Sequence, residues 1–206
     1  MRISVFASGS TGNCTLVQAG GERLLIDAGI SLRRMCAFLA GEGISPSELS
    51  CVLITHEHTD HISGLDMLTK KHGTKVVAPR TVAARLRGML PGVEDYIEVI
   101  RAGESFHIGE AEVRAFRTLH DTDESVGYRI EAESSFGLCT DLGCLTDEVL
   151  EAMSGVELKK SFSASPMRTG SLRLMIPPRF LRIPGTACTR TRFRAICLRA
   201  AFGCSP

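Results

Sequence analysis

The sequence predicts an α/β (α+β) fold, and three observations lead to that prediction. Short apolar runs of strand length alternate with segments of helical periodicity through the first 157 residues. Polar clusters follow two of these runs, at 55–61 and 120–121, where the carboxyl ends of strands carry sites in layered α/β folds. Apolar residues make up 44% of 206 residues, with no Trp and two Tyr, so we expect one domain with an aliphatic core.

The first half of the chain predicts a strand meander followed by alternating helices and strands. Ser31 is the expected N-cap of a helix that ends near Gly41 and Gly43. Gly73 is expected to end a second helix, and Pro79 to open a third that buries Val82, Leu86, Met89 and Leu90. The predicted strands are 2–7, 14–18, 23–27, 51–55 and 75–78, and the predicted helices are 32–40, 64–72 and 80–90.

The second half predicts mainly strands. Ala111, Val113 and Ala115 alternate along the longest of them and are expected to point inward. Thr146 is the expected start of a helix to Met153, with two acidic residues in its first turn. The predicted strands are 96–100, 105–108, 110–119, 126–132 and 136–139, with another beginning at 155.

The histidine-rich segment, residues 55–61, reads Thr-His-Glu-His-Thr-Asp-His and is the centre of the functional interpretation. It follows the apolar run 51–54 and holds three of the six histidines of the chain. His56 and His58 are two residues apart, so on an extended segment they point the same way, while Asp60 and His61 can face a second ion. Imidazole and carboxylate ligands suit zinc, with manganese or iron as alternatives.

Further polar residues stand where other predicted strands end. His120-Asp121 closes the long strand 110–119, and Asp141 follows the strand 136–139, where a carboxylate can bridge two cations. Asp27 ends the third strand, where it could brace a ligand histidine or simply cap the next turn. Asp121 could accept a proton or orient a ligand, and the sequence does not separate the two.

The His-x-His-x-Asp-His pattern at 56–61 resembles that of the metallo-β-lactamase-fold hydrolases. The segments 8–13, 25–29, 120–121 and 140–143 follow in the order of that family. The Ser-Gly-Ser-x-Gly-Asn opening is similar to the bacterial branch called YycJ or WalJ, regarded as DNA exonucleases. The resemblance implies an αββα sandwich, recognisable over residues 1–157, whose second half is incomplete here. The family supplies a further histidine from that half, whereas this chain has none after His120.

From these ligands we expect two divalent metals, zinc first. His56, His58 and His120 would hold one, and Asp60, His61 and Asp141 the other, with Asp141 shared; Asp60 and His120 are the expected catalytic residues. Two cations acidify a water held between them, and the resulting hydroxide attacks phosphorus or a carbonyl. The opening loop could present Ser8, Gly9, Ser10, Gly12 and Asn13 to a phosphate, or could be a plain tight turn, which we favour.

The net charge of +1 conceals a split at residue 158. Residues 1–157 hold all 23 acidic residues against 14 Lys and Arg, a formal charge of −9, whereas residues 158–206 hold ten Lys and Arg and no acid. Three interpretations of this basic segment remain: translation in a shifted frame, which we favour, a disordered extension, and a nucleic-acid-binding arm. We expect the chain to be impaired by it.

The function expected from these patterns is that of a metal-dependent phosphodiesterase with nucleic acid as substrate. Hydrolysis of a thioester or small phosphodiester, oxidation of a thiol at a mononuclear iron, and an inactive relic are the alternatives. No signal peptide and no apolar run of membrane length is visible, so we expect a cytoplasmic protein without a membrane partner. The eight Cys lack a C-x-x-C pair and are expected to be reduced. The oligomeric state stays open.

Overall fold

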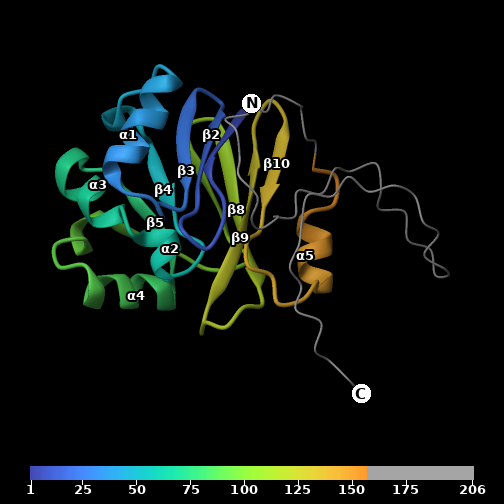
Figure 1. Cartoon of the computed structure of the whole chain (residues 1–206). Helices are drawn as coiled ribbons and strands as arrows, with labels where there is room; N and C mark the ends of the chain where they lie inside the picture. The colour runs from blue at the N-terminus through green and yellow to red at the C-terminus, as the bar shows by residue number, and fades with distance from the viewer. Residues whose placement is uncertain (157–206) are drawn as a thin grey trace.

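A mixed sheet of six strands forms the first layer of the fold in the computed structural model, which describes residues 1–156 (Figure 1). Its strand order follows the chain, and the first three strands are antiparallel while the next three run parallel to β3. The strands are β1 (Arg2–Ala7), β2 (Cys14–Ala19), β3 (Glu22–Ile26), β4 (Cys51–Leu53), β5 (Val76–Pro79) and β6 (Ile97–Ile100). The parallel strands bring their carboxyl ends to one edge of the sheet.

A second, antiparallel sheet packs on the first and has the order β10-β9-β8-β7. Its strands are β7 (Ser105–Ile108), β8 (Ala111–Thr118), β9 (Ser125–Glu131) and β10 (Ser135–Leu138). Ala111, Val113 and Ala115 of β8 are buried, as their alternation predicts. They face Leu24 and Leu53 of the first sheet in one core that lies between the two sheets.

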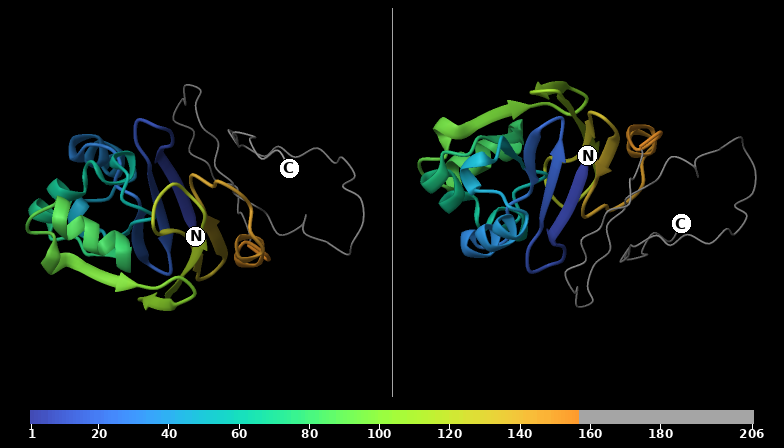
Figure 2. Two further views of the ribbon diagram at one scale, coloured as in Figure 1. Left: turned by 90° about the horizontal axis from the view of Figure 1, so that it is seen from below. Right: turned by 90° about the horizontal axis from the view of Figure 1, so that it is seen from above.

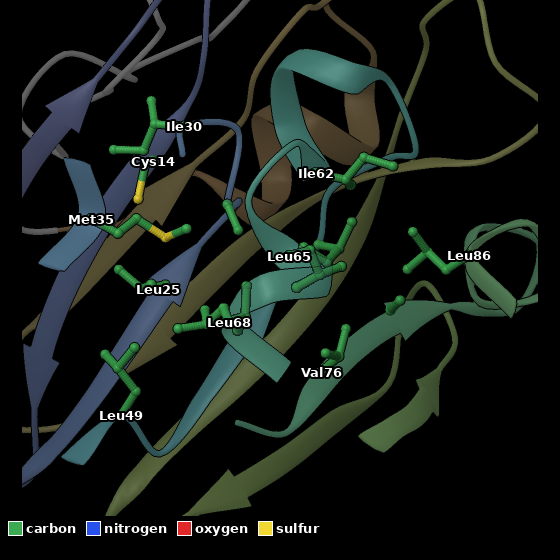
Figure 3. Packing of buried hydrophobic residues seen from close by; sticks show 14 of the residues in the cluster. Cys14, Leu25, Ile30, Met35, Leu49, Ile62, Leu65, Leu68, Val76 and Leu86 are labelled. Atoms are coloured by element: carbon green, nitrogen blue, oxygen red, sulfur yellow. The ribbon is translucent and has the colours of Figure 1, made fainter. Parts of the chain in front are cut away.

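Three helices cover the outer face of the first sheet: α1 (Leu32–Gly41), α3 (Leu65–His72) and α4 (Arg80–Met89). Met35, Leu65 and Leu86 are fully buried and pack against Leu25 and Val76 of the sheet (Figure 3). These helices therefore present the amphipathic faces that their periodicity predicts.

On the far side of the second sheet lies α5 (Asp147–Ala152) (Figure 2). Its Val149 packs with Phe116 and Cys139 in a separate apolar cluster. The layers are therefore helix, sheet, sheet and helix, which confirms the predicted αββα architecture. In the described part of the chain, α5 is the one helix assigned to this outer layer. Two short 3-10 helices, Pro46–Glu48 and Glu94–Tyr96, complete the connections.

Some local predictions need correction. Thr59–Ile62 of the histidine-rich segment forms a helical turn, α2, rather than an open loop. Ser31 occupies the N-cap of α1 without a side-chain cap bond. Met89 is 51% exposed and is the last residue of α4, whereas the sequence predicts it on the buried face. Val156 belongs to no strand, and the rest of the strand predicted from 155, like the basic segment, lies outside the described residues.

The cysteines of the described part are all free thiols, as expected for a reduced protein. Cys14, Cys51 and Cys139 are buried, whereas Cys144 is exposed and does not pack, because it lies in the turn before α5. Among residues 1–156 we find no helix that is both long and apolar enough to span a bilayer.

Candidate metal centre

Four imidazoles converge at the carboxyl edge of the first sheet. His56 follows β4 on an extended segment, His58 stands at the N-cap of α2, and His61 lies within that helix. His120 comes from the second sheet, two residues after β8 ends. The ring of His56 lies 4.0 Å from that of His61, 4.6 Å from that of His58 and 4.8 Å from that of His120, measured between centroids.

The structure assembles two sets of side chains with the spacing of metal ligands. The three-histidine group consists of His56, His58 and His120, and the Asp141 group consists of His56, His61 and Asp141. Within each group the ligand atoms lie within 4.8 Å of one another. The other two histidines of the chain, His72 and His107, belong to neither group.

The three-histidine group matches the ligand set predicted for the first metal. His58 Nδ1 lies 3.3 Å from His120 Nε2. The same His120 Nε2 lies 2.9 Å from Asp121 Oδ1. Asp121 Oδ1 is also 3.8 Å from His58 Nε2. Asp121 is therefore an exposed carboxylate beside two candidate ligands, so it can orient their imidazoles from the open side.

The Asp141 group differs in one member from the set predicted for the second metal. His61 Nε2 lies 2.8 Å from Asp141 Oδ2, and His56 Nε2 lies 4.0 Å from the same oxygen. The carboxylate of Asp60 lies at the margin, with Oδ2 3.6 Å from His61 Nε2. His56 is common to the two groups, but it has one free ring nitrogen and can bind one cation, so Asp141 stays the predicted bridge.

A relay of hydrogen bonds beneath the histidines orients two of them. Asp27 Oδ1 accepts from the Thr55 N–H at 2.9 Å and from the Thr55 hydroxyl at 3.0 Å. Because that hydroxyl donates to Asp27, its lone pair can accept from His56 Nδ1, 3.0 Å away. His61 Nδ1 donates to Asp27 Oδ2 at 2.7 Å. Both Nδ1 atoms then carry hydrogen, so each Nε2 is directed at the centre.

The side chains present fit a divalent metal. His56 Nε2 is buried and has no hydrogen-bond partner in the described part of the chain, so its lone pair is unused. Burial, and then the neighbouring His61, lower the pKa of His56 to about 4. A neutral imidazole with an unused lone pair at neutral pH is the state that a metal requires.

His61 differs from His56 in protonation. Burial acts to lower the pKa of His61, but the charge of Asp27 and the hydrogen bonds to Asp141 and Asp27 outweigh it and raise the pKa to about 9. In the protein without metal, His61 is therefore protonated at neutral pH. A metal that binds its Nε2 must displace this proton.

Asn13 belongs to the candidate centre in a different role from the one predicted. Its side chain is buried, and Nδ2 lies 3.0 Å from Asp60 Oδ2 and 2.6 Å from His61 Nε2. Its Oδ1 accepts from the Gly9 N–H at 2.9 Å, which fixes the orientation of the amide. Asn13 thus holds Asp60 and lies against His61 instead of facing the surface.

The opening loop places two of its residues at the entrance. A pocket of about 220 Å³ is lined by Gly9 and Ser10, together with His58, Asp60, His120, Asp121 and Asp141. Ser8 and Gly12 are not in this lining. The Gly12 N–H donates to Gly9 O, and the Asn13 N–H donates to Asp60 O. These N–H groups are therefore used within the protein, which favours the tight-turn interpretation of the loop.

Both non-glycine residues of the described part with positive φ lie at this centre: Asp27 at 61° and Asp141 at 52°. Asp tolerates the left-handed region better than most residues, but the conformation is uncommon there. It directs each carboxylate toward the histidines at the point where its strand ends. Such conformations cluster at functional sites because the surrounding structure must enforce them.

Several polar residues at the centre were missed from the sequence. Thr55 connects Asp27 with two histidines, and Glu57 is buried against Thr122 and Arg85. Thr55 and Glu57 stand inside the histidine-rich segment, so their position was the available signal. Nothing in the sequence connects Arg85 with that segment, because only the fold brings α4 beside it.

A two-sheet sandwich with histidines and carboxylates gathered at its strand ends defines a class of metal-dependent hydrolase. Comparison with known proteins agrees. A family model described as "Beta-lactamase superfamily domain" matches residues 22–159. The chain is 30% identical to the exodeoxyribonuclease WalJ of Streptococcus pneumoniae, covering 87% of this chain and 70% of that protein. It is also 30% identical to the exodeoxyribonuclease YycJ of Bacillus anthracis, covering 91% and 73%.

The chain therefore belongs to the β-lactamase superfamily and is a metal-dependent hydrolase. Both alignments cover more of the chain than residues 1–157, so they continue into the basic segment. Among solved structures, zinc-bound PqqB from Methylobacterium extorquens has a TM-score of 0.63 at 17% identity, covering 76% of this chain and 71% of PqqB. A B3 metallo-β-lactamase gives 0.55 at 19% identity, covering 72% and 67%. These likenesses concern the fold alone.

Proposed function

We propose that the chain is a dinuclear phosphodiesterase acting on nucleic acid, most specifically a DNA exonuclease. The observation that carries this proposal is the pair of adjacent ligand groups, each of three side chains, at the strand ends. Two adjacent metals are the usual solution for phosphodiester cleavage, because they stabilise both the attacking and the leaving oxygen. The named activities of WalJ and YycJ, and of a ribonuclease Z from Mycolicibacterium gilvum that is 30% identical over 122 residues, support nucleic acid as the substrate class.

In this proposal the three-histidine group holds one metal, and His61, Asp141 and Asp60 hold the other. Zinc is the first choice, since three or four imidazoles with carboxylates suit it, and manganese or iron are the alternatives. When bound, the two metals supply a water acidified to near neutral pH and positive charge opposite the phosphate.

The protein's own residues orient the metal ligands and form the entrance for the substrate. Asp27 and Thr55 fix the imidazoles so that each Nε2 faces the centre, and Asn13 holds the carboxylate of Asp60. Gly9 and Ser10 border the pocket through which a phosphodiester would enter. Asp121, whose side chain is 78% exposed, lines the same pocket and is placed to accept a proton at its Oδ1.

A nuclease assay of the purified chain, supplied with Zn²⁺ or Mn²⁺, tests this proposal. The substrates are end-labelled single- and double-stranded DNA, RNA and a generic phosphodiester. We expect stepwise shortening of DNA from one end, and loss of activity in His58→Ala. His72→Ala, which alters a histidine away from the centre, is the matched control. No cleavage of any of these substrates, with two metals bound per chain, would rule out the phosphodiesterase and favour thioester hydrolysis or a relic.

We further propose that the basic segment 158–206 arises from translation in a shifted frame. Its ten Lys and Arg without one acid, and the lack of any His after His120, support this. The nucleotide sequence near codon 158 tests it: a shifted frame should restore strand and helix patterns and a Gly-His motif. If neither alternative frame does so, the segment is a genuine extension, in keeping with alignments that continue into it.

A further inference from the structure

Glu57 stands between two candidate ligands but faces away from them. His56 and His58 both belong to the three-histidine group, whereas the side chain of Glu57 contacts Thr122 and Arg85 instead. There Glu57 is only 6% exposed. Its Oε1 accepts from the Thr122 hydroxyl at 2.7 Å and from Arg85 Nη1, while its Oε2 has no partner among the described residues. Burial of a charged carboxylate costs free energy, so Glu57 is stable in this position only with the positive charge of Arg85 beside it.

Arg85, on α4, connects two segments that are far apart in the sequence. One nitrogen of its guanidinium donates to Glu57 and the other to Asp123. Glu57 lies in the histidine-rich segment, and Asp123 lies in the His120 loop, residues 119–124, between β8 and β9. A guanidinium can serve two carboxylates at once because its donors form a planar fork.

The His120 loop makes a second contact with the same helix. Glu124 Oε2 accepts from the Thr81 N–H at 2.7 Å, in the first turn of α4. Pro79 is the N-cap of that helix and provides no side-chain cap, so Glu124 satisfies one of its first N–H groups. The His120 loop is thus bound to α4 at two points, through Glu124 to Thr81 and through Asp123 to Arg85.

These contacts determine where His120 can lie. His120 comes from the second sheet, whereas His56 and His58 follow a strand of the first sheet. The three-histidine group exists only if the His120 loop stays in place, with its Nε2 3.3 Å from His58 Nδ1. Asp121 and Asp123 are 78% and 69% exposed, so burial does not hold this side of the loop.

We propose that Arg85 is a positioning residue for the three-histidine group: by bridging Glu57 and Asp123 it holds the His120 loop against the histidine-rich segment and so sets the metal affinity of that group. The proposal rests on the metal centre of the proposed function, but not on its substrate. The two partners of Arg85, Glu57 and Asp123, belong to neither ligand group.

The experiment measures zinc binding to the full chain by competition with a chromophoric chelator, which resolves the equivalents and their affinities. Arg85→Met removes the charge and keeps the apolar stem. Arg87→Met is the matched control, since Arg87 is exposed on the same helix and forms no ion pair within 4.0 Å among the described residues. Arg85→Lys and Thr122→Val are milder variants. Unfolding of the metal-free proteins is followed in parallel.

We expect Arg85→Met to weaken one zinc equivalent by about 10- to 100-fold and to leave the other unchanged, the range found for residues that orient metal ligands. Arg85→Lys should recover part of the loss, because an ammonium reaches one carboxylate but cannot form the fork. Thr122→Val should weaken the same equivalent less, and Arg87→Met should match the wild type.

Two results would overturn the proposal. One is unchanged affinity of both equivalents in Arg85→Met. The other is a parallel loss of both equivalents together with a lower melting temperature, which would make Arg85 a general scaffold residue. Because zinc affinity is the readout, absence of DNA cleavage with normal zinc binding would remove the proposed substrate and leave this inference standing.

Discussion

The two sides of the candidate centre differ in how their side chains are held. On the His61 side, His61 and Asp27 are each about 1% exposed and form a direct ion pair. On the His120 side, His58 and His120 are 37% and 20% exposed, and the nearest carboxylate, Asp121, is 78% exposed. The His61 side is built into the core of the first sheet. The His120 side joins His58, which follows a strand of the first sheet, to a surface loop of the second sheet.

This difference indicates how a site can be both rigid and open. The buried side fixes imidazole directions through Asp27 and Thr55, since low solvent access strengthens those hydrogen bonds. The exposed side borders the pocket and leaves room for a substrate. The buried side should therefore set metal retention, and the exposed side should be the more easily altered by substitution at a distance.

The largest expected effect comes from removing the carboxylate that we propose the two metals share. Asp141→Ala should weaken binding of both metals, because each oxygen of a carboxylate can bind one cation, whereas His58→Ala should affect only the metal of the three-histidine group. Metal content per chain after dialysis, measured by elemental analysis, distinguishes the two variants. Equal losses in the two variants would show that Asp141 does not bridge the metals.

The next effect tests the rigidity of the buried side. A Cβ on Gly29 would lie 1.6 Å from Asp60 O and 2.7 Å from Asn13 N, both of them backbone atoms. Gly29→Ala should therefore lower the free energy of unfolding by about 3 kcal/mol or more, as severe overpacking does. Urea unfolding of the metal-free protein measures this. Gly41→Ala, where a Cβ meets nothing within 4 Å, is the control and should be neutral or slightly stabilising.

A smaller effect is expected from Asp27→Asn, which keeps the shape of the side chain and tolerates the positive φ. It removes the charge that pairs with His61, so zinc affinity of the Asp141 group should fall by about 10- to 100-fold. His56 should be less affected, because an Asn oxygen can still accept from Thr55. Chelator competition on both equivalents checks the prediction, which fails if the three-histidine group weakens more.

The smallest effect is a change in proton release. Because the pKa of His61 is raised to about 9, zinc binding at pH 7.5 must displace its proton, and this release should vanish as pH rises through 9. In Asp27→Asn the release should be smaller by about one proton at pH 7.5. Calorimetry in buffers with different ionisation enthalpies counts the protons. Identical counts in the two proteins would contradict the assigned protonation of His61.

Much of the fold followed from local pattern. The strands 2–7, 105–108 and 126–132 were predicted to within a residue, since apolar alternation reports burial directly. The turn α2 was missed because four residues are too few to reveal a helical period. Met89 was assigned to the buried face of α4, but periodicity does not show where the sheet beneath a helix ends.

The sequence by itself determined the candidate ligands and their places: His56, His58, His61, His120 and Asp141 all follow apolar strands, and strand ends meet at one edge. Only the tertiary structure decided which ligands share a group, how Asn13 and Thr55 serve them, and that Arg85 joins two loops. The physical reason is that strand period and ligand chemistry are local properties. Hydrogen-bond partners 28 to 47 residues apart depend on how sheets and helices pack.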